Sequence, residues 1–550
     1  MYRINWFKGN LIVLNEEGSF KDIKPVFHEE LNFLRFNSKY FYPESSHPIL
    51  WSIGNEYFYD SKPIAKVKWG GFYSNFRAVF NETNVSFKPI DLKALLELNC
   101  EKIENISQRK MDLIQEIFSE HGKDFDIIVV AFSGGKDSLV VLDLVQRVIP
   151  PDEFVVIFSD TTMELRENLE YVKKIESFYN KLTFYIVRSE KDYRQTWREF
   201  GPPSRVHRWC CSVHKSAPVV KLARKLTGKS NPRILVIDGV RSSEGNSRSF
   251  LPTISAGKYV LQKNFHPILD WSSAEVYLYI FSRNLPFNPL YRLGLRRVGC
   301  VVCPLAPKSW ENILKCLYEK EISPFLKIIK DFALENGVKR EEVEDYIDSG
   351  DWKARVNSRS KPEVLISDGK ISIKAGRKGY LIEWAKILKT SLEATLKDGY
   401  VEIERNDPRI QKIANKAAYC VNCGVCEAIC PTGAIQMNVD SLMLHSDRCI
   451  HCFECVDFNP SGCLRADSLK VPQGGVKMKK ISYGRYKHFG LRKKWLDEFF
   501  REYPNWFKEN GLGPVQFSAM KLWLIDAGIL ENNTLTQLGE ELSKLGAQSP

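Results

Sequence analysis

The pattern of apolar and polar positions in residues 120–240 predicts strands that alternate with helices, as in an open α/β sheet. Residues 126–132, Asp-Ile-Ile-Val-Val-Ala-Phe, form an almost continuous apolar run, which is typical of a strand buried on both faces. Helices are predicted at about 138–148 and 165–179, and strands at 154–158 and near Phe184 and Ile234. The fold class expected for this part is therefore α/β, with an open parallel sheet.

The chain has 550 residues, which is too long for a single core and predicts several domains. Alternation at Glu56-Tyr57-Phe58-Tyr59 indicates a small β-rich N-terminal module, and helical periodicity at 519–525 indicates a helical or winged-helix-like C-terminal unit. The predicted parts are a β-rich module (1–95), an α/β domain (96–310), a connecting mixed α/β subdomain (311–410), a cysteine-rich α+β module (411–470), and a basic linker with the helical unit (471–550).

Composition indicates a cytoplasmic protein with no membrane segment. Hydrophobic residues make up 44% of the chain, as in ordinary globular proteins. No stretch of about 18 uncharged apolar residues occurs, and the first residues, MYRINWFKGN, lack the apolar core of a signal peptide. The 14 cysteines have the spacings of metal ligands, so we expect a reducing compartment and no disulfide framework.

Eight cysteines near the C-terminal third predict two 4Fe-4S clusters. The run C-x2-C-x2-C-x3-C-P at Cys420, Cys423, Cys426, Cys430 and Pro431 is that of bacterial ferredoxins, in which the fourth cysteine ligates the other cluster. The predicted ligand sets are therefore Cys420, Cys423, Cys426 and Cys463 for one cluster, and Cys430, Cys449, Cys452 and Cys455 for the other. Such clusters require an electron donor protein or another low-potential reductant.

Four further cysteines lie within the α/β region, as the adjacent pair Cys210 and Cys211 and the C-x-x-C of Cys300 and Cys303. Thiolates from two distant chain segments can enclose a 4Fe-4S cluster or a zinc ion. The neighbouring ferredoxin-like module favours iron, which makes three 4Fe-4S clusters in total. Cys100 and Cys316 are left over.

The segment Ser133-Gly134-Gly135-Lys136-Asp137-Ser138 separates the buried strand from the following helix. Glycines allow backbone N–H groups to approach a phosphate chain, and the helix N-terminus adds a positive end. The segment is neither a Walker A loop nor a dinucleotide turn. Lys136 could neutralise phosphate charge and Asp137 could help to hold Mg²⁺.

This loop and several later segments resemble the phosphoadenosine phosphosulfate (PAPS) reductase family of the adenine nucleotide alpha hydrolase superfamily, over about residues 120–310. The resembling segments are Phe158-Ser159-Asp160-Thr161-Thr162, Arg208-Trp209-Cys210-Cys211 with Lys215 and Pro218, Gly239-Val240-Arg241 with Glu244 and Arg248, Pro267-Ile268-Leu269-Asp270-Trp271-Ser272, Asn288-Pro289-Leu290-Tyr291, and Gly299-Cys300-Val301-Val302-Cys303.

The resemblance implies an adenine nucleotide substrate: PAPS, adenylyl sulfate or ATP. Asp160, Thr161, Gly239 and Arg241 would then lie at the nucleotide together with residues 133–138. Arg241 and Arg248 would contact an anionic sulfate or phosphate group. These two arginines would be catalytic residues, together with Lys136 and Asp137. The cysteine pair with C-x-x-C marks the members that are similar to adenylyl sulfate reductases and carry a 4Fe-4S cluster.

Two departures from the family leave the reaction open. No Glu-Cys-Gly-Leu-His segment with the usual cysteine nucleophile is present, and Gly245 stands where serine is usual. We therefore expect an iron-sulfur oxidoreductase that carries out electron-fed sulfur chemistry at an adenine nucleotide. The alternative is an ATP-dependent sulfurtransferase that inserts sulfur into nucleic acid, because the loop retains Lys136 and Asp137 and residues 487–539 resemble a domain accompanying DNA phosphorothioation systems.

Basic residues give a third hypothesis, a non-catalytic redox-sensing nucleic-acid binder. The net charge is +12, and residues 470–494 carry nine Lys or Arg and no acidic residue, with aromatic rings interleaved. Such a run can contact phosphates and stack on bases, or it can be a solvated linker. An oligomer is compatible with the sequence.

Overall fold

The computed structural model describes residues 3–16, 22–81, 85–245, 248, 250–259, 261–355, 362–367, 369–388, 392–404, 407–469, 493–507, 512, 514–531 and 533–545. The chain forms two compact units, Met1–Val471 and Pro472–Pro550, and each is described by itself. No helix among the described residues is both long and apolar enough to span a membrane.

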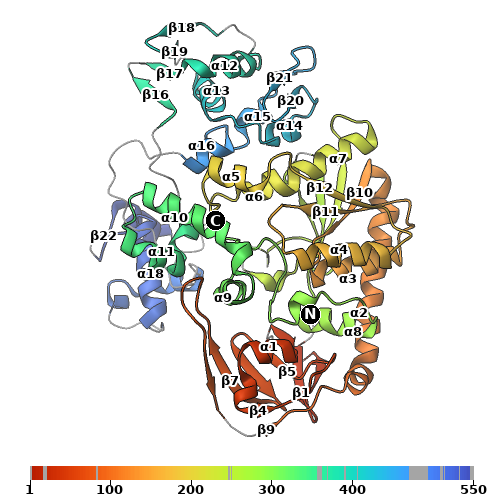
Figure 1. Ribbon diagram of the computed structural model, residues 1–550. Helices are drawn as coiled ribbons and strands as arrows, with labels where there is room; N and C mark the ends of the chain where they lie inside the picture. The colour runs from red at the N-terminus through yellow and green to blue at the C-terminus, as the bar shows by residue number, and fades with distance from the viewer. Residues whose placement is uncertain are drawn as a thin grey trace. The chain divides into compact units, whose positions relative to one another are not determined.

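A six-stranded sheet at the centre of the first unit confirms the predicted α/β class (Figure 1). Its strand order is β12-β11-β10-β13-β15-β14, and only the edge pair β14–β15 is antiparallel. The strands are β10 (Ile127–Phe132), β11 (Val155–Asp160), β12 (Phe184–Arg188), β13 (Ile234–Ile237), β14 (Ile254–Ala256) and β15 (Gln262–Phe265).

Both faces of this sheet are buried, which explains its apolar sequence. Along β10, Ile128, Val130 and Phe132 pack into one hydrophobic core, whereas Val129 packs into a second core on the opposite face. Helices α2, α3 and α8 pack against one another, and α7 lies against β11 and β12. The helices of this region are α2 (Leu92–His121), α3 (Lys136–Gln146), α4 (Arg166–Phe178), α5 (Tyr193–Phe200), α6 (Trp209–Cys211), α7 (Ala217–Thr227) and α8 (Ser273–Ser282).

The N-terminal module is β-rich, as predicted. A hairpin, β1 (Arg3–Phe7) with β2 (Leu11–Asn15), precedes an antiparallel sheet of order β3-β5-β6-β7-β8. Those strands are β3 (Ile23–Val26), β5 (Leu50–Ile53), β6 (Glu56–Tyr59), β7 (Lys62–Lys68) and β8 (Arg77–Phe80), with α1 (His28–Phe33) between β3 and β5. The predicted alternation at residues 56–59 belongs to β6.

The segment between the C-x-x-C and the ferredoxin-like cysteines packs in two directions. Helices α9 (Lys308–Leu317), α10 (Glu319–Glu335) and α11 (Val343–Ser349) share the core of the α/β domain. The sheet that follows instead shares a core with the ferredoxin-like cysteines. This sheet contains β16 (Val364–Ser367), β17 (Lys370–Lys374), β19 (Tyr400–Glu404) and β18 (Ala394–Lys397), covered by α12 (Lys378–Ala385) and α13 (Pro408–Tyr419).

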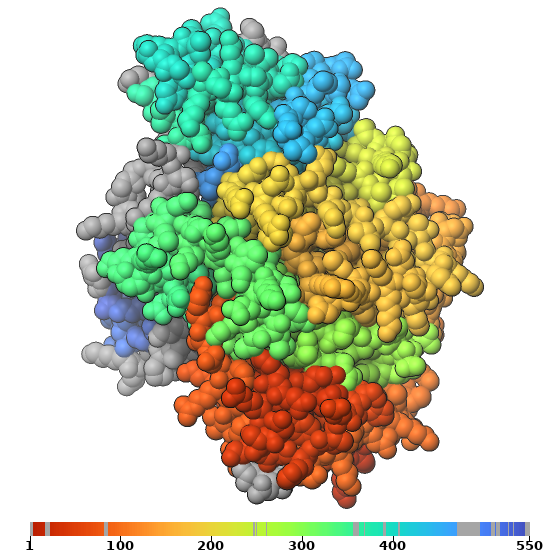
Figure 2. All heavy atoms as spheres, viewed as in Figure 1, coloured from red at the N-terminus to blue at the C-terminus, as the bar shows by residue number. Residues whose placement is uncertain are grey.

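Arginine side chains join the ferredoxin-like module to the α/β domain. Arg224 of α7 donates to the carbonyl oxygens of Glu427, Ala428 and Cys430 at 2.6, 3.2 and 2.6 Å. Arg355 donates to the carbonyl oxygen of Ser468 at 2.8 Å and to that of Pro202 at 2.6 Å. In the space-filling view the blue atoms of this module lie directly against the yellow atoms of the α/β domain (Figure 2).

The ferredoxin-like module itself contains short elements around its cysteines. They are α14 (Val425–Ile429), the antiparallel pair β20 (Ile435–Met437) and β21 (Leu442–Leu444), α15 (Glu454–Asp457) and α16 (Leu464–Leu469).

The second unit is small and mainly helical, as predicted, and it also contains a short antiparallel pair. Its elements are α17 (Lys493–Glu502), α18 (Pro514–Asp526), β22 (Leu530–Glu531), β23 (Thr534–Leu535) and α19 (Gln537–Leu545). Phe499, Trp506, Met520 and Leu524 form its core. Most of the basic run, residues 470–492, lies outside the described residues, so its contact with nucleic acid stays a prediction.

Candidate functional site

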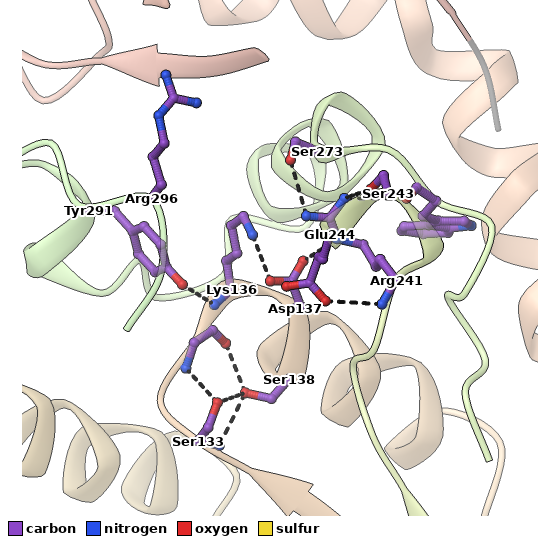
Figure 3. A network of polar contacts seen from close by, with 12 residues as sticks. Ser133, Lys136, Asp137, Ser138, Arg241, Ser243, Glu244, Ser273, Tyr291 and Arg296 are labelled. Atoms are coloured by element: carbon purple, nitrogen blue, oxygen red, sulfur yellow. Dashed lines mark hydrogen bonds and ion pairs between the residues drawn. The ribbon is translucent and has the colours of Figure 1, made fainter. Parts of the chain in front are cut away.

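The loop between β10 and α3 is built as a close-packed turn (Figure 3). Gly134 has φ +76°, and a Cβ there would lie 2.2 Å from Asn168 Oδ1, so only glycine fits. Ser138 Oγ donates to the Gly135 carbonyl at 2.9 Å and accepts from the Ser133 N–H at 3.2 Å. The Lys136 N–H, at the start of α3, donates to the Tyr291 hydroxyl at 2.9 Å.

The end of β13 comes unusually close to this helix start. A Cβ at Gly239 would lie 2.7 Å from the Asp137 carbonyl carbon and 2.8 Å from the Ser138 nitrogen. The structure thus brings Gly239 against residues 133–138, as the nucleotide-site prediction requires. Glycine at this position allows the following residues to pass directly over the loop.

Asp137 lies between two buried cations (Figure 3). Its Oδ2 accepts from Lys136 Nζ at 2.6 Å and its Oδ1 accepts from Arg241 Nε at 2.7 Å. Lys136 is 5% exposed and Arg241 is 3% exposed. Burial by itself would raise the pKa of Asp137, but the two cations outweigh it and hold that pKa below its usual value. Asp137 is therefore ionised.

The two predicted anion-binding arginines are both engaged with protein groups. Besides Asp137, Arg241 donates to Ser243 Oγ at 2.8 Å, to the Trp271 carbonyl at 3.3 Å and to Ser273 Oγ at 3.1 Å. Arg248 forms an ion pair with Glu244. In this state Arg241 positions Asp137, and its contact with a substrate anion stays a prediction.

Asp160 and Thr161 lie between the loop of residues 133–138, called the nucleotide loop below, and the cysteines of the α/β domain. Asp160, at the end of β11, is buried, forms an ion pair with Arg188 and accepts from the Thr162 N–H at 2.8 Å. Thr161 Oγ1 lies 3.5 Å from Cys300 Sγ and donates to Glu164 at 3.0 Å. Because carboxyl ends of parallel strands bind ligands in such folds, the cysteines stand beside the expected substrate position.

Cys210, Cys211, Cys300 and Cys303 are close enough to influence one another electrostatically. The pair lies on α6, and the Val301 N–H donates to the Met163 carbonyl at 2.8 Å, which fixes the C-x-x-C loop beside β11. A hydrogen bond from Cys210 and the charge of Lys215 lower the pKa of Cys211 to about 5, although burial opposes them. Cys300 in turn raises the pKa of Lys215. The hydrogen bond with Cys211 raises the pKa of Cys210, and burial raises that of Cys300, so the thiolate, the form that ligates iron, is favoured at Cys211 and disfavoured at those two.

The eight ferredoxin-like cysteines line two separate cavities. One cavity is lined by Cys420, Cys423, Cys426 and Cys463, together with Lys416 and Trp384. The other is lined by Cys430, Cys449, Cys452 and Cys455. Each cavity therefore contains one complete predicted set, with Cys430 crossing to the second, and four thiols around one cavity fit a 4Fe-4S cluster.

Ligation by these particular cysteines stays a prediction. Among the described residues, no three His, Cys, Asp or Glu side chains are grouped so that they could hold a single metal ion; the two four-cysteine sets surround cavities instead.

The two remaining cysteines lack the features of a nucleophile. Cys100 on α2 and Cys316 on α9 are exposed. Cys100 donates to Glu104 Oε1 at 3.3 Å, and this hydrogen bond raises its pKa, whereas partial burial raises the pKa of Cys316. A raised pKa leaves the thiol protonated and less reactive.

Some residues that shape the site were not predicted from the sequence. Asn168 of α4 donates to the Ser133 carbonyl at 3.4 Å, and Asn288 donates to the Gly134 carbonyl at 2.8 Å. Asn288 belongs to a segment quoted for the family resemblance, which was a usable signal. Lys416, which follows Ile413 and Ala414 on α13, had no such signal.

The N-terminal module also reaches this region. Arg292 donates to Glu29 Oε1 at 2.6 Å and to the Ser45 carbonyl at 2.8 Å, one residue after Tyr291. Arg296 donates to Ser52 Oγ at 3.1 Å. The module therefore braces the segment whose tyrosine contacts the nucleotide loop.

Two family models match the chain. The phosphoadenosine phosphosulfate reductase domain matches residues 127–306, and the 4Fe-4S dicluster domain matches residues 412–460. The chain therefore carries a PAPS reductase domain joined to a 4Fe-4S dicluster domain, which confirms the resemblance. The second match supports iron-sulfur clusters in residues 412–460, and a third cluster in the α/β domain stays a prediction.

Individual relatives are more distant. An uncharacterized protein of Methanocaldococcus jannaschii is 30% identical over 47% of this chain and 59% of its own length. A second one is 29% identical over 46% of this chain and 50% of its own length, so the chain spans little more than half of these relatives. Adenosine 5'-phosphosulfate reductase of Halalkalibacterium halodurans is 24% identical over 40% of this chain and 90% of its own length. Among solved structures, PAPS reductase from Candida auris aligns with a TM-score of 0.28 and 22% identity, over 36% of this chain and 94% of that chain.

Proposed function

We propose that the chain is an iron-sulfur enzyme that reduces a sulfate group carried by an adenine nucleotide, adenylyl sulfate or PAPS. The proposal rests mainly on the 3.5 Å approach of Thr161 Oγ1 to Cys300 Sγ, because it sets the cysteine group of the α/β domain at the sheet edge that carries the nucleotide loop. Substrate sulfur bound there would lie beside a redox centre.

Electrons would reach this centre from the dicluster domain. Tyr259 lies close enough to Cys423 and Cys426 to feel their charge, and its neighbour Lys258 lies similarly close to Cys210 and Cys211. Two adjacent side chains therefore link a dicluster cavity to the cysteine group of the α/β domain. Iron-sulfur clusters supply single electrons, and reduction of the sulfate sulfur to sulfite takes two electrons and releases the nucleotide.

The protein's own residues would bind and orient the nucleotide. Backbone N–H groups of residues 133–138 and the start of α3 suit a phosphate group, and Lys136 would neutralise its charge. For this contact Lys136 must exchange its ion pair with Asp137 for one with the substrate. Arg241 would meanwhile keep the Asp137 carboxylate in place.

ATP-dependent sulfur transfer to a nucleic acid remains the second candidate. The observation that favours it is the absence of an activated thiol outside the predicted cluster sets, since Cys100 and Cys316 are exposed and have raised pKa values. In that reaction the loop would cleave ATP to AMP and pyrophosphate, and Asp137 would help to hold Mg²⁺.

Parallel anaerobic turnover with adenylyl sulfate, PAPS and ATP separates the two candidates. We expect sulfite together with AMP from adenylyl sulfate, or with 3',5'-bisphosphate from PAPS. Lys136→Ala should abolish both products. Lys173→Ala, which removes an exposed lysine of α4, should retain them. Pyrophosphate release from ATP stimulated by DNA or tRNA, without sulfite from either sulfonucleotide, would replace the first candidate with the second.

A further inference from the structure

Lys416 is a buried lysine in the wall of a predicted cluster cavity. It lies on α13, is 1% exposed, and lines the cavity of Cys420, Cys423, Cys426 and Cys463. Its Nζ donates to Cys426 Sγ at 2.9 Å. The same nitrogen lies 4.3 Å from the centre of the Trp384 ring and 5.2 Å from that of Phe458, so aromatic faces enclose the rest of the ammonium.

The opposite charges near this ammonium are sulfur atoms. Within the part of the chain that the structure describes, no carboxylate lies within ion-pair distance of Lys416, whereas Cys426, Cys455 and Cys463 all act on it electrostatically. Lys412, one turn earlier on the same helix, is different: it pairs with Asp457 at 2.8 Å and is partly exposed. A buried cation without a counter-charge costs free energy, so the negative charge that stabilises the Lys416 ammonium must come from the cysteine sulfur atoms.

The position is also asymmetric between the two cysteine sets. Lys416 lines only the cavity of the Cys420 set and donates its hydrogen bond to a member of that set. Cys455 of the other set also acts on it electrostatically, more strongly than Cys463 does, so the asymmetry lies in the hydrogen bond and in the cavity wall. That other set includes the exposed Cys452, so it is the one open to an external electron donor.

We propose that Lys416 makes the cluster of the Cys420 set the easier of the two to reduce, so that electrons entering at the Cys452 side move inward. Reduction adds one negative charge to a cluster, and a nearby buried ammonium stabilises that charge. Hydrogen bonds to sulfur and local net charge are the terms that set such potentials. The inference rests on the dicluster domain alone and is independent of which nucleotide is reduced.

Anaerobic redox titration of the full-length, iron-loaded chain, followed by electron paramagnetic resonance, tests this proposal. Lys416→Met removes the charge and keeps the length of the side chain. We expect the equilibrium constant for one-electron reduction of the cluster of the Cys420 set to fall at least tenfold, which corresponds to a drop in its reduction potential of about 59 mV. The potential of the cluster of the Cys430 set should shift less. The Cys452→Ser variant shows which paramagnetic signal belongs to that cluster, because Cys452 is one of its predicted ligands.

Matched variants complete the test. Lys416→Arg keeps the charge and should leave both potentials close to those of the unmodified chain, and Lys412→Met, which removes a lysine already paired with Asp457, should do the same. Unchanged potentials in Lys416→Met would overturn the proposal. Loss of iron in both Lys416→Met and Lys416→Gln, with full iron in Lys416→Arg, would also overturn it, because the ammonium would then serve cluster retention. Sulfite formation is measured separately, so a failed reaction assay leaves this result unaffected.

Discussion

Replacing Asp137 by asparagine should destabilise the protein and at the same time tighten its binding of phosphate anions. The carboxylate is shared by Lys136 and Arg241, both nearly inaccessible to water. Asparagine keeps the size and one acceptor oxygen but removes the negative charge. Two buried cations then lose their counter-charge, and an incoming phosphate no longer competes with a carboxylate for Lys136.

The size of both effects follows from the geometry. Removing one partner of a buried ion pair costs about 3–5 kcal/mol, and we expect about 3 because the amide oxygen still accepts one hydrogen bond. A unit phosphate charge about 5 Å from the carboxylate, at an effective dielectric constant of about 20, is repelled by about 3 kcal/mol. Solvent screening reduces that figure, so an affinity gain of about tenfold is expected, equivalent to about 1.4 kcal/mol.

The assay combines calorimetric binding of pyrophosphate without Mg²⁺ and thermal unfolding of the unliganded chain. Asp137→Asn should bind pyrophosphate more tightly and unfold at a lower temperature. Asp152→Asn, at an exposed position, should change neither. Adding Mg²⁺ should remove the gain in affinity if Asp137 helps to hold the ion. An unchanged unfolding temperature with weaker pyrophosphate binding would refute the electrostatic reasoning.

Three further predictions concern single contacts. Tyr291→Phe removes the acceptor of the Lys136 N–H and should weaken nucleotide binding by about 1 kcal/mol, measured by calorimetry. Burial lowers the pKa of His214 from 6.5 to about 4, so between these pH values the unfolded chain binds a proton that the folded chain does not. The free energy of unfolding should therefore fall by about 3 kcal/mol from pH 6.5 to 4. Chemical unfolding of His214→Gln should show a flatter pH profile. Cys430→Ser should alter the same paramagnetic signal as Cys449→Ser and leave the signal altered by Cys426→Ser unchanged, because Cys430 lines the second cavity.

Local sequence was sufficient for much of the fold and for the grouping of the cysteines. The apolar run before Ser133 becomes β10, and helix α3 begins at Lys136, since both depend on short-range pattern and on glycine placement. Cys430 reaches the second cavity because the ferredoxin spacing itself dictates the crossing. The PAPS reductase resemblance likewise rests on contiguous segments, and the family match confirms it.

Interactions between distant segments were beyond sequence reasoning. No residue near Arg241 in the sequence indicates that its guanidinium would form an ion pair with Asp137, 104 positions earlier. The sheet of residues 364–404 was predicted as part of a connecting subdomain, yet it packs into the core of the dicluster cysteines. Lys416 lies on an apolar helix face, where sequence alone cannot distinguish a buried ammonium from one that reaches solvent.

The arginines that join the dicluster module to the α/β domain bear on the kinetics of electron transfer. Arg224 and Arg355 each bind backbone carbonyl oxygens on the far side of this junction, and backbone cannot move aside as a side chain can. Proteins that carry electrons on a swinging domain slow down in viscous solvent, because each transfer waits for diffusion. Under the proposed function, electron transfer between the two modules should instead be insensitive to added glycerol or sucrose, since these contacts hold the modules side by side.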